Sequence, residues 1–482
     1  MPEDACRVEA RDPEGFPMDD RTRRLLRAPI VPTLLRLAGP NVLVMLAQAL
    51  VGLIETGFVA GLGTDALAGM ALVFPLLMLV QMVSAGGMGG GILSAVARSL
   101  GAGRQDTADA LVWHAVVIAL GLGLLTSLAA LTLGPVLYAA MGGVDGSLAA
   151  ASAYGGVIFA GAALIWLFNA LAAVLRGTGN MALPATVTCL GTLVLLPVSP
   201  ALIYGIGPVP GLGIVGGGVA VVAYYAAGSA VFVHHLWSGR GLVRPAPRPP
   251  RLTLAPMAAI LKVGAVSSVI SLTTNVTIAA ATSFAGAAGP GAVAGYGTGA
   301  RLEYLLVPLV FGLGAPVGAM VGTCIGAGDR ARAVRVAWIG ALIAGLLTEA
   351  IGLAAALRPE AFLRLFGDDP AMLATGARYL HLVGPFYGCA GIGLALYFAA
   401  QGAGRVGWPL VAGLARLAVS VGGGWLALRA GAGLDGVFLA LGLGLLVLAL
   451  VNAVATAAGA WSRRAPAPAA MPAARITSPR GT

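Results

Sequence analysis

The fold class is decided by the apolar stretch at residues 66–97, which reads ALAGMALVFPLLMLVQMVSAGGMGGGILSAVA and contains no charged residue. A bilayer core takes about 20 apolar residues per helix, and stretches of that length recur from one end of the chain to the other. Only 10% of the 482 residues are charged, against about 25% in soluble proteins. We therefore expect an all-α polytopic membrane protein. The composition excludes a soluble enzyme, a disulfide scaffold and a disordered chain.

Apolar segments separated by glycine, proline and arginine predict about twelve transmembrane helices in two six-helix lobes. The first six spans fall near residues 37–60, 66–97, 110–133, 148–174, 181–204 and 213–236. The second six fall near 257–285, 291–323, 333–357, 371–400, 406–428 and 435–460. The predicted organisation is a cytoplasmic N-terminal tail at 1–32, a lobe at 33–236, a cytoplasmic linker at 237–256, a second lobe at 257–460 and a cytoplasmic C-terminal tail at 461–482.

The two lobes are related by an internal repeat with a constant offset of 225 residues. The matching groups are Gly101-Ala102-Gly103 with Gly326-Ala327-Gly328, and Gly177, Gly179 and Pro184 with Gly402, Gly404 and Pro409. Because six spans is an even number, both lobes begin on the same side of the membrane. The repeat is therefore parallel, with its axis along the membrane normal, as in several transporters.

The net charge of +10 is the excess of 29 basic over 19 acidic residues, and most of the basic residues lie in short loops and tails. They concentrate in the loops after the even-numbered spans and in the linker. Because cytoplasmic loops are enriched in Lys and Arg, we expect a multi-pass protein of the plasma (inner) membrane with both termini cytoplasmic. No basic helix or aromatic-interleaved patch gathers the charge, so the expected partner is the lipid bilayer and not a nucleic acid.

A polar stripe marks the first span, where Asn41, Gln48 and Glu55 are spaced by seven residues. Seven residues is nearly two helical turns, so the three side chains share one face. For Asn41 and Gln48, a hydrogen-bonded seam between helices is an equally good interpretation. Glu55 differs because burial disfavours the charged form of a carboxylic acid, which suits it to taking up and releasing a proton.

Other polar groups inside the spans are further cleft or pathway candidates. Glu303 and Glu349 are acids within spans, and Arg416 could pair with either, so a structural and a functional role both stay open. In the second lobe the stripe maps to Ser267, Thr274 and Ala281, which keeps a polar face without an acid. Asn180, Ser199, Thr274 and Asn275 complete the candidates. The cysteines and histidines show no metal-ligand spacing, so no metal and no catalytic residue is expected.

Several turns resemble those of the multidrug and toxic compound extrusion (MATE) family. The matching stretches are Ser99-Leu100-Gly101-Ala102-Gly103-Arg104, Ile325-Gly326-Ala327-Gly328-Asp329-Arg330, Arg176-Gly177-Thr178-Gly179-Asn180, Gln401-Gly402-Ala403-Gly404-Arg405 and Glu55-Thr56-Gly57-Phe58-Val59-Ala60-Gly61-Leu62-Gly63. The likeness covers nearly the whole chain except its tails, and it is strongest for the prokaryotic branch. It implies a secondary antiporter that exports amphipathic or cationic small organic compounds by alternating access, in exchange for H⁺ or Na⁺.

The resemblance also implies roles for single residues. Glu55 takes the place of the family's first-span acid, and Asn180 that of the turn asparagine. Where the prokaryotic branch has Asn-x-x-x-Asp-Pro, this chain has Leu195 through Ser199-Pro200, so a two-carboxylate site is absent. A single Glu55 favours H⁺ coupling, with Na⁺ as the alternative and no cofactor beyond the ion gradient. The protein is expected to function as a monomer.

Two other functions are alternatives to multidrug efflux. A flippase or exporter of a lipid-linked or polysaccharide precursor, from the same transporter superfamily, would be expected to have more spans and a strongly basic cavity. A polytopic membrane enzyme would need clustered His, Asp or Ser groups at one membrane face, and the sequence offers none.

Overall fold

The computed structural model describes residues 19–206 and 209–460. Ten helical segments are long and apolar enough to cross a membrane, and the bent pair α6–α7 makes an eleventh. With α2 (Ile30–Ala60), an apolar helix of 31 residues, twelve long helical segments fill the described part of the chain. The predicted all-α polytopic fold is confirmed.

The N-lobe contains α2 and the helices up to the linker. They are α3 (Thr64–Gln81), the π-helical turn η1 (Met82–Met88), α4 (Gly89–Gly101), α5 (Gln105–Ala140), α6 (Asp145–Ala160), α7 (Ala162–Gly177), α8 (Ala182–Tyr204) and α9 (Ile214–Trp237). After α8, β1 (Gly205–Ile206) pairs antiparallel with β2 (Val209–Pro210), with Gly205 opposite Pro210 and Ile206 opposite Val209.

The C-lobe begins at α10 and repeats this order. It contains α10 (Leu254–Gly286), α11 (Pro290–Gly326), α12 (Arg330–Leu357), α13 (Pro359–Leu363), α14 (Pro370–Val383), the 3₁₀ turn η2 (Gly384–Phe386), α15 (Tyr387–Gly402), α16 (Gly407–Leu417), the π-helical turn η3 (Ala418–Gly422), α17 (Gly423–Arg429) and α18 (Gly433–Ala457). The repeat extends to helix ends, because α4 and α11 end at Gly101 and Gly326, and α7 and α15 end at Gly177 and Gly402.

The helix boundaries differ from the predicted ones at the N-terminus and at the linker. An additional short helix, α1 (Asp20–Arg27), lies inside the segment predicted as a tail, and α2 begins at residue 30, whereas the first span was predicted to begin near residue 37. Asp19 caps α1 by accepting a hydrogen bond from the Arg21 amide, which satisfies one amide of its first turn. The segment between α9 and α10 runs from 238 to 253, shorter than the predicted linker.

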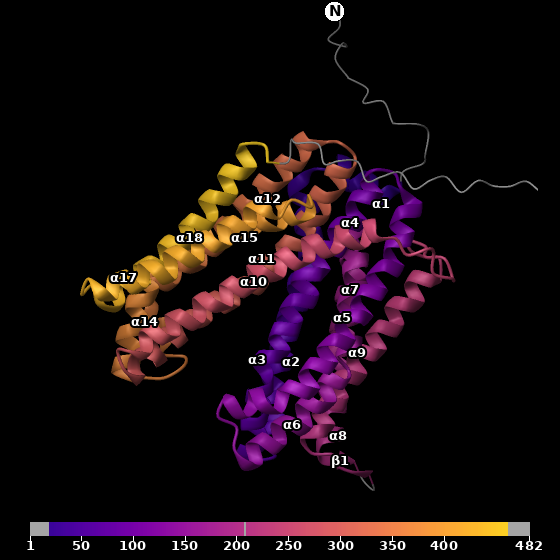
Figure 1. Ribbon diagram of the computed structural model, residues 1–482. Helices are drawn as coiled ribbons and strands as arrows, with labels where there is room; N and C mark the ends of the chain where they lie inside the picture. The colour runs from indigo at the N-terminus through magenta and orange to yellow at the C-terminus, as the bar shows by residue number, and fades with distance from the viewer. Residues whose placement is uncertain (1–18, 207–208, 461–482) are drawn as a thin grey trace, which may run out of the picture.

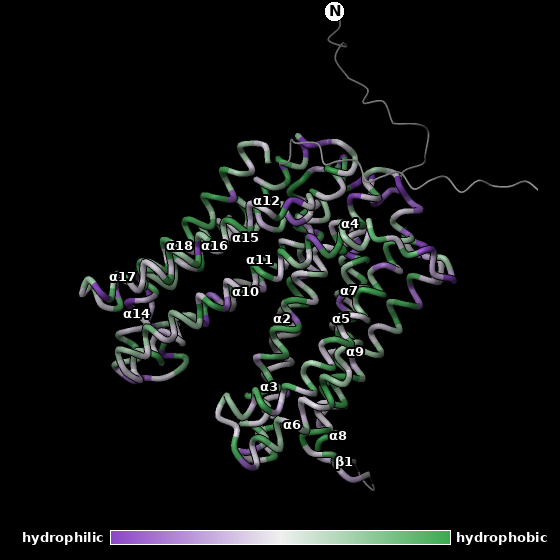
Figure 2. Tube along the Cα trace, viewed as in Figure 1, coloured by the Kyte–Doolittle hydropathy of each residue, from purple (hydrophilic) through white to green (hydrophobic). Residues whose placement is uncertain are grey.

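The two lobes converge at one end and diverge at the other. Figure 1 shows them meeting near α4 and α12, with α14 and α17 on one diverging arm and α6 and β1 on the other. Figure 2 shows hydrophobic residues along most of the helices, as expected for lipid-facing and core positions. We call the end where α4 and α11 terminate the convergent end.

Glycines hold the lobes together at the convergent end. A Cβ atom on Gly101 would lie 2.0 Å from the carbonyl oxygen of Thr323, and one on Gly326 would lie 2.2 Å from the carbonyl oxygen of Arg98. The 225-residue repeat relates Gly101 to Gly326 and Arg98 to Thr323, so each contact is the symmetry counterpart of the other. The pseudo-two-fold axis therefore passes between the two contacts. Only glycine permits this closeness between α4 and α11.

The glycine-rich stretch at residues 86–91, which spans the end of η1 and the start of α4, permits a second close approach between the lobes. A Cβ atom on Gly91 would lie 2.6 Å from the Ile260 carbonyl oxygen of α10. The backbone also departs from α-helical geometry over Met82–Met88. The stretch therefore combines close helix packing with a helix irregularity, whereas Pro40 and Pro75 lie inside continuous α-helices.

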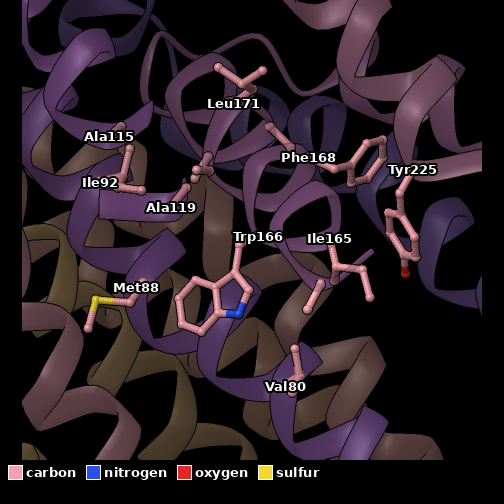
Figure 3. Close-up of a cluster of buried hydrophobic side chains, with 14 of the residues drawn as sticks. Val80, Met88, Ile92, Ala115, Ala119, Ile165, Trp166, Phe168, Leu171 and Tyr225 are labelled. Atoms are coloured by element: carbon pink, nitrogen blue, oxygen red, sulfur yellow. The ribbon is translucent and has the colours of Figure 1, made fainter. Parts of the chain in front are cut away.

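The N-lobe core forms where α4, α5 and α7 face one another. Figure 3 shows Trp166 of α7 among Val80, Met88 and Ile165. The indole nitrogen of Trp166 donates to the hydroxyl of Thr126 on α5 at 3.1 Å, so its polar group is satisfied within the core. This packing fixes α7, which carries Asn169 and Arg176.

The linker between the lobes is fixed along α5 by side chains on one helical face. Asp109 accepts a hydrogen bond from the Arg244 amide at 2.8 Å, and Trp113 donates to the Ala246 carbonyl at 2.9 Å. His114 accepts one from the Thr253 amide at 3.2 Å. The linker therefore belongs to the N-lobe up to the first residue of α10.

Candidate functional site

Glu55 lies near the end of α2 with a partly buried side chain. Its Oε1 is buried and has no hydrogen-bond partner among the described residues. Tyr154 of α6 and Tyr225 of α9 are close enough for electrostatic interaction with its carboxylate. An acid without a fixed partner is free to change its protonation state without breaking a hydrogen bond.

A polar network continues from Tyr225 into the N-lobe. Gln81 donates to the hydroxyl of Tyr225. The amide of Asn169 donates to Gln81 Oε1 at 3.0 Å and to Ser84 Oγ at 2.8 Å. Gln81 and Asn169 were not among the residues predicted from the sequence. Both are polar residues within predicted spans, and because a polar group is costly in a bilayer, that property alone could have identified them.

The other two residues of the predicted stripe do not gather around Glu55. Asn41 is only 1% exposed and donates to the Gly312 carbonyl of α11 at 3.3 Å. It therefore forms the helix–helix seam that was its alternative interpretation, here between the two lobes. The side chain of Gln48 lies outside the described residues.

Of the two candidates around α8, one lies far from Glu55 and the other has an unpartnered hydroxyl. Asn180 Oδ1 accepts from the Leu183 amide at 3.2 Å and so satisfies the first turn of α8. Tyr204 at the other end of α8 donates to the Phe58 carbonyl, which places that end beside α2. Ser199 is 1% exposed and its hydroxyl has no partner among the described residues. At about 1.5 Å per residue, Asn180 is roughly 28 Å away from Ser199 along the helix.

In the C-lobe, the acids have partners that fix them. Arg416 pairs with Glu303 at 3.0 Å, and Tyr379 donates to the other oxygen of Glu303 at 3.4 Å. Glu349 accepts a 2.6 Å hydrogen bond from the Gly388 amide, in the first turn of α15. A carboxylate at a helix N-terminus is stabilised by the helix dipole and the free amides there. Both acids thus have structural contacts that Glu55 lacks.

Thr274 and Asn275 lie on α10 without contacting an acid. Thr274 donates to the Ile270 carbonyl at 3.5 Å and lines a small cavity of the C-lobe together with Arg416. Asn275 is exposed and donates to the Ser271 carbonyl at 3.0 Å. Its amide also lies 3.6 Å from the sulfur of Met82 in η1, so it bridges the two lobes.

Two further hydrogen bonds join the lobes, and a third, within the C-lobe, positions one of the donors. Ser94 of α4 donates to the Gly402 carbonyl at 2.8 Å. Gln401 of α15 donates to the Gly86 carbonyl at 3.1 Å and lies 2.9 Å from Ser267 Oγ. The described residues contain no group of three or more His, Cys, Asp or Glu side chains that could hold a metal ion. The arrangement therefore offers a proton site in the N-lobe and a polar interface between lobes.

Comparison with known proteins identifies the same architecture elsewhere. The family model MatE matches residues 40–201 and 267–426, one segment in each lobe. A protein of Shewanella oneidensis named FAD transporter is 28% identical over 408 residues, which cover 83% of this chain and 88% of that protein. The probable multidrug resistance protein NorM of Thermotoga maritima is 25% identical over 394 residues, covering 80% of this chain and 82% of the relative.

Solved structures agree with the fold. A crystal structure of MATE in the bent conformation superposes with a TM-score of 0.85 at 25% identity, covering 92% of this chain and 98% of the other. The outward-facing conformation of a multidrug resistance MATE family transporter of the MOP superfamily superposes with a TM-score of 0.83 at 24% identity, covering 93% and 99%. The latter likeness concerns the fold alone.

Proposed function

The chain belongs to the MatE family of transporters, and on this premise we propose that it is a secondary active antiporter that exports small amphipathic or cationic organic compounds. It is a multi-pass membrane protein and a transporter rather than an enzyme. In the proposed cycle, H⁺ moves inward through Glu55 while the lobes alternate between outward-open and inward-open states. No cofactor beyond the H⁺ gradient is part of this proposal.

The observation that carries the proposal is the difference between Glu55 and the other acids inside the helices. Glu303 is paired with Arg416, and Glu349 accepts a backbone hydrogen bond, whereas Glu55 has a buried oxygen without a partner. A coupling group must gain and lose its proton in each cycle, and a fixed ion pair resists this exchange. Glu55 meets that requirement best among the acids of the described helices.

Alternating access is supported by where the lobes touch. Close glycine contacts join α4 and α11 at the convergent end, and the arms separate toward α14 and α6 in Figure 1. We propose that the convergent end faces the cytoplasm, that both termini are cytoplasmic and that the protein resides in the plasma (inner) membrane. The arginine-rich linker and turns on that side support this orientation. We also propose that the monomer is the functional unit, because the two lobes of a single chain contain the whole candidate site.

A reconstituted assay tests the proposed function. Purified protein in proteoliposomes is given ethidium, a fluorescent cation, under an imposed pH gradient and separately under a Na⁺ gradient. We expect transport with the pH gradient and its loss in Glu55→Gln. Transport driven by Na⁺ alone would refute H⁺ coupling. Transport that needs no gradient would refute antiport, and movement of a lipid-linked sugar instead of ethidium would favour the flippase alternative.

A second candidate substrate class follows from a relative. The Shewanella oneidensis protein that is 28% identical to this chain is named FAD transporter. FAD is an amphipathic compound with phosphate groups, so export of anionic amphipathic compounds is the second candidate. The same proteoliposomes, loaded with FAD in place of ethidium, distinguish the two classes.

A further inference from the structure

Arg176 lines a small cavity where the two lobes meet. The cavity, about 20 Å³ in volume, lies between η1, α4 and α7 of the N-lobe and α11 and α15 of the C-lobe. Arg176 is the only charged residue among those that line it, and the others are apolar or glycine apart from Gln401. The Arg176 side chain is 7% exposed. A full positive charge is therefore held in an apolar cavity at the lobe interface.

Arg176 has no counter-charge among the described residues. Its Nε is buried without a hydrogen-bond partner, and no ion pair is formed. The titratable group that interacts with it, Tyr224, is a neutral phenol hydrogen-bonded to Thr188. Buried charges are ordinarily paired because an isolated one is costly.

The other buried arginine among the described residues has a counter-charge. Arg416 is 8% exposed, and although its Nε is also buried without a partner, its Nη2 pairs with Glu303 at 3.0 Å. Arg176 lacks such a counter-charge and faces the cavity between the lobes, so we expect its partner to come from outside the chain.

Gln401 supplies a second polar group on the opposite side of the cavity. It occupies the position that the 225-residue repeat pairs with Arg176, and it is 4% exposed. Its amide nitrogen donates to Ser267 Oγ at 2.9 Å, to the Gly86 carbonyl at 3.1 Å and to the Tyr397 hydroxyl at 3.1 Å. Both N–H groups of Gln401 are therefore engaged, and Arg176 is the donor left for a guest in the cavity. The pseudo-two-fold axis thus brings a guanidinium from the N-lobe and a fixed amide from the C-lobe to one cavity.

We propose that Arg176, in the cavity that Gln401 closes from the C-lobe, binds the anionic group, a phosphate or a carboxylate, of a transported amphipathic compound. The guanidinium has five N–H donors in a planar fork that suits such oxygens. With a volume of about 20 Å³, the cavity admits one water-sized guest. One oxygen of the group would fill it in this conformation, so entry of the whole group requires the lobes to separate. The proposal rests on the proposed transport function and favours the second of its two substrate classes, anionic amphipathic compounds.

Equilibrium binding to the full-length protein in detergent tests the site. The probes are riboflavin 5′-phosphate, riboflavin, which lacks only the phosphate, and inorganic phosphate. We expect the phosphorylated flavin to bind about 10- to 100-fold more tightly than riboflavin, the range of a charged hydrogen bond. Arg176→Gln should remove this difference, and Arg176→Lys should keep most of it.

Control variants and outcomes keep this test separate from that of the proposed function. Arg378→Gln, a change at an exposed arginine of α14, should bind like the wild type. Equal affinity for the two flavins, or an unchanged preference in Arg176→Gln, would overturn the proposal. Binding of inorganic phosphate without the flavin phosphate would also overturn it, because the site would then hold a free ion. Binding needs no gradient, so failed proton coupling at Glu55 leaves this result untouched.

Discussion

Adding one methyl group at the convergent end should open the contact between the lobes. In Gly101→Ala, the new Cβ would lie 2.0 Å from the Thr323 carbonyl oxygen, which is 1.4 Å closer than the 3.4 Å at which ordinary contact begins. Both sides of this contact are backbone, so a side-chain rotation cannot relieve it. Overpacking of this kind costs about 1–3 kcal/mol. If the lobes separate to relieve it, the closed state loses about 5- to 150-fold in relative population.

Spin labels on the two Gly-Ala-Gly turns report this separation. Ala102→Cys and Ala327→Cys place labels on exposed positions that the repeat relates to each other, with the native cysteines replaced. Wild type should give the dipolar-broadened spectrum of closely spaced labels, and Gly101→Ala should give a mixture with separated ones. Gly326→Ala should act alike, because its Cβ would lie 2.2 Å from the Arg98 carbonyl oxygen.

Gly121→Ala is the matched control for this prediction. Gly121 lies in α5 with nothing within 4 Å of the added Cβ, and alanine is favoured over glycine in a helix by about 1 kcal/mol. Its spectrum should equal that of the wild type and its thermal stability should not fall. If Gly101→Ala behaves like Gly121→Ala, the contact between α4 and α11 does not hold the lobes closed.

Two further predictions concern the C-lobe ion pair and the linker. Arg416→Met or Glu303→Leu alone should lower the free energy of unfolding by about 3–5 kcal/mol, because each leaves a largely buried charge unpaired. The double variant should recover most of this loss. Denaturant unfolding in micelles measures the three values, and additive losses in the double variant would contradict the prediction. His114→Phe removes the hydrogen bond from the Thr253 amide. Because this loosens the linker, tryptic cleavage after Arg251 should be about 2- to 10-fold faster. An unchanged cleavage rate would show that the linker is held without this hydrogen bond.

The twelve long helices and the repeat could be predicted because each follows from a local property of the sequence. The bilayer thickness sets the length of an apolar segment, and the 225-residue offset is visible in short glycine motifs such as that at Gly101. The helix α1 was missed because its charged residues resemble a tail, and its stability comes from contacts with the rest of the protein. Arg332 of α12, for example, donates to the Leu25 carbonyl at 3.3 Å.

The candidate site was only partly predictable because its partners come from helices distant in the sequence. The choice of Glu303 rather than Glu349 as the partner of Arg416 depends on how α11 and α16 pack. The seam formed by Asn41 likewise needs α11 to pass beside α2. The assignment of Asn180 to the site rested on a family resemblance, whereas the structure gives it a capping role at α8.

The most direct test of proton coupling is the proton release that accompanies substrate binding. Purified protein in a weakly buffered detergent solution is mixed with ethidium, and the pH change is recorded. The proposal predicts release of about one proton per bound molecule in the wild type, since Glu55 is the one unpaired titrating acid of the polar network. Glu349→Gln, which keeps an acceptor for the Gly388 amide, should release the same amount, and Glu55→Gln should bind substrate without release. Equal proton release by Glu55→Gln and wild type would contradict the account.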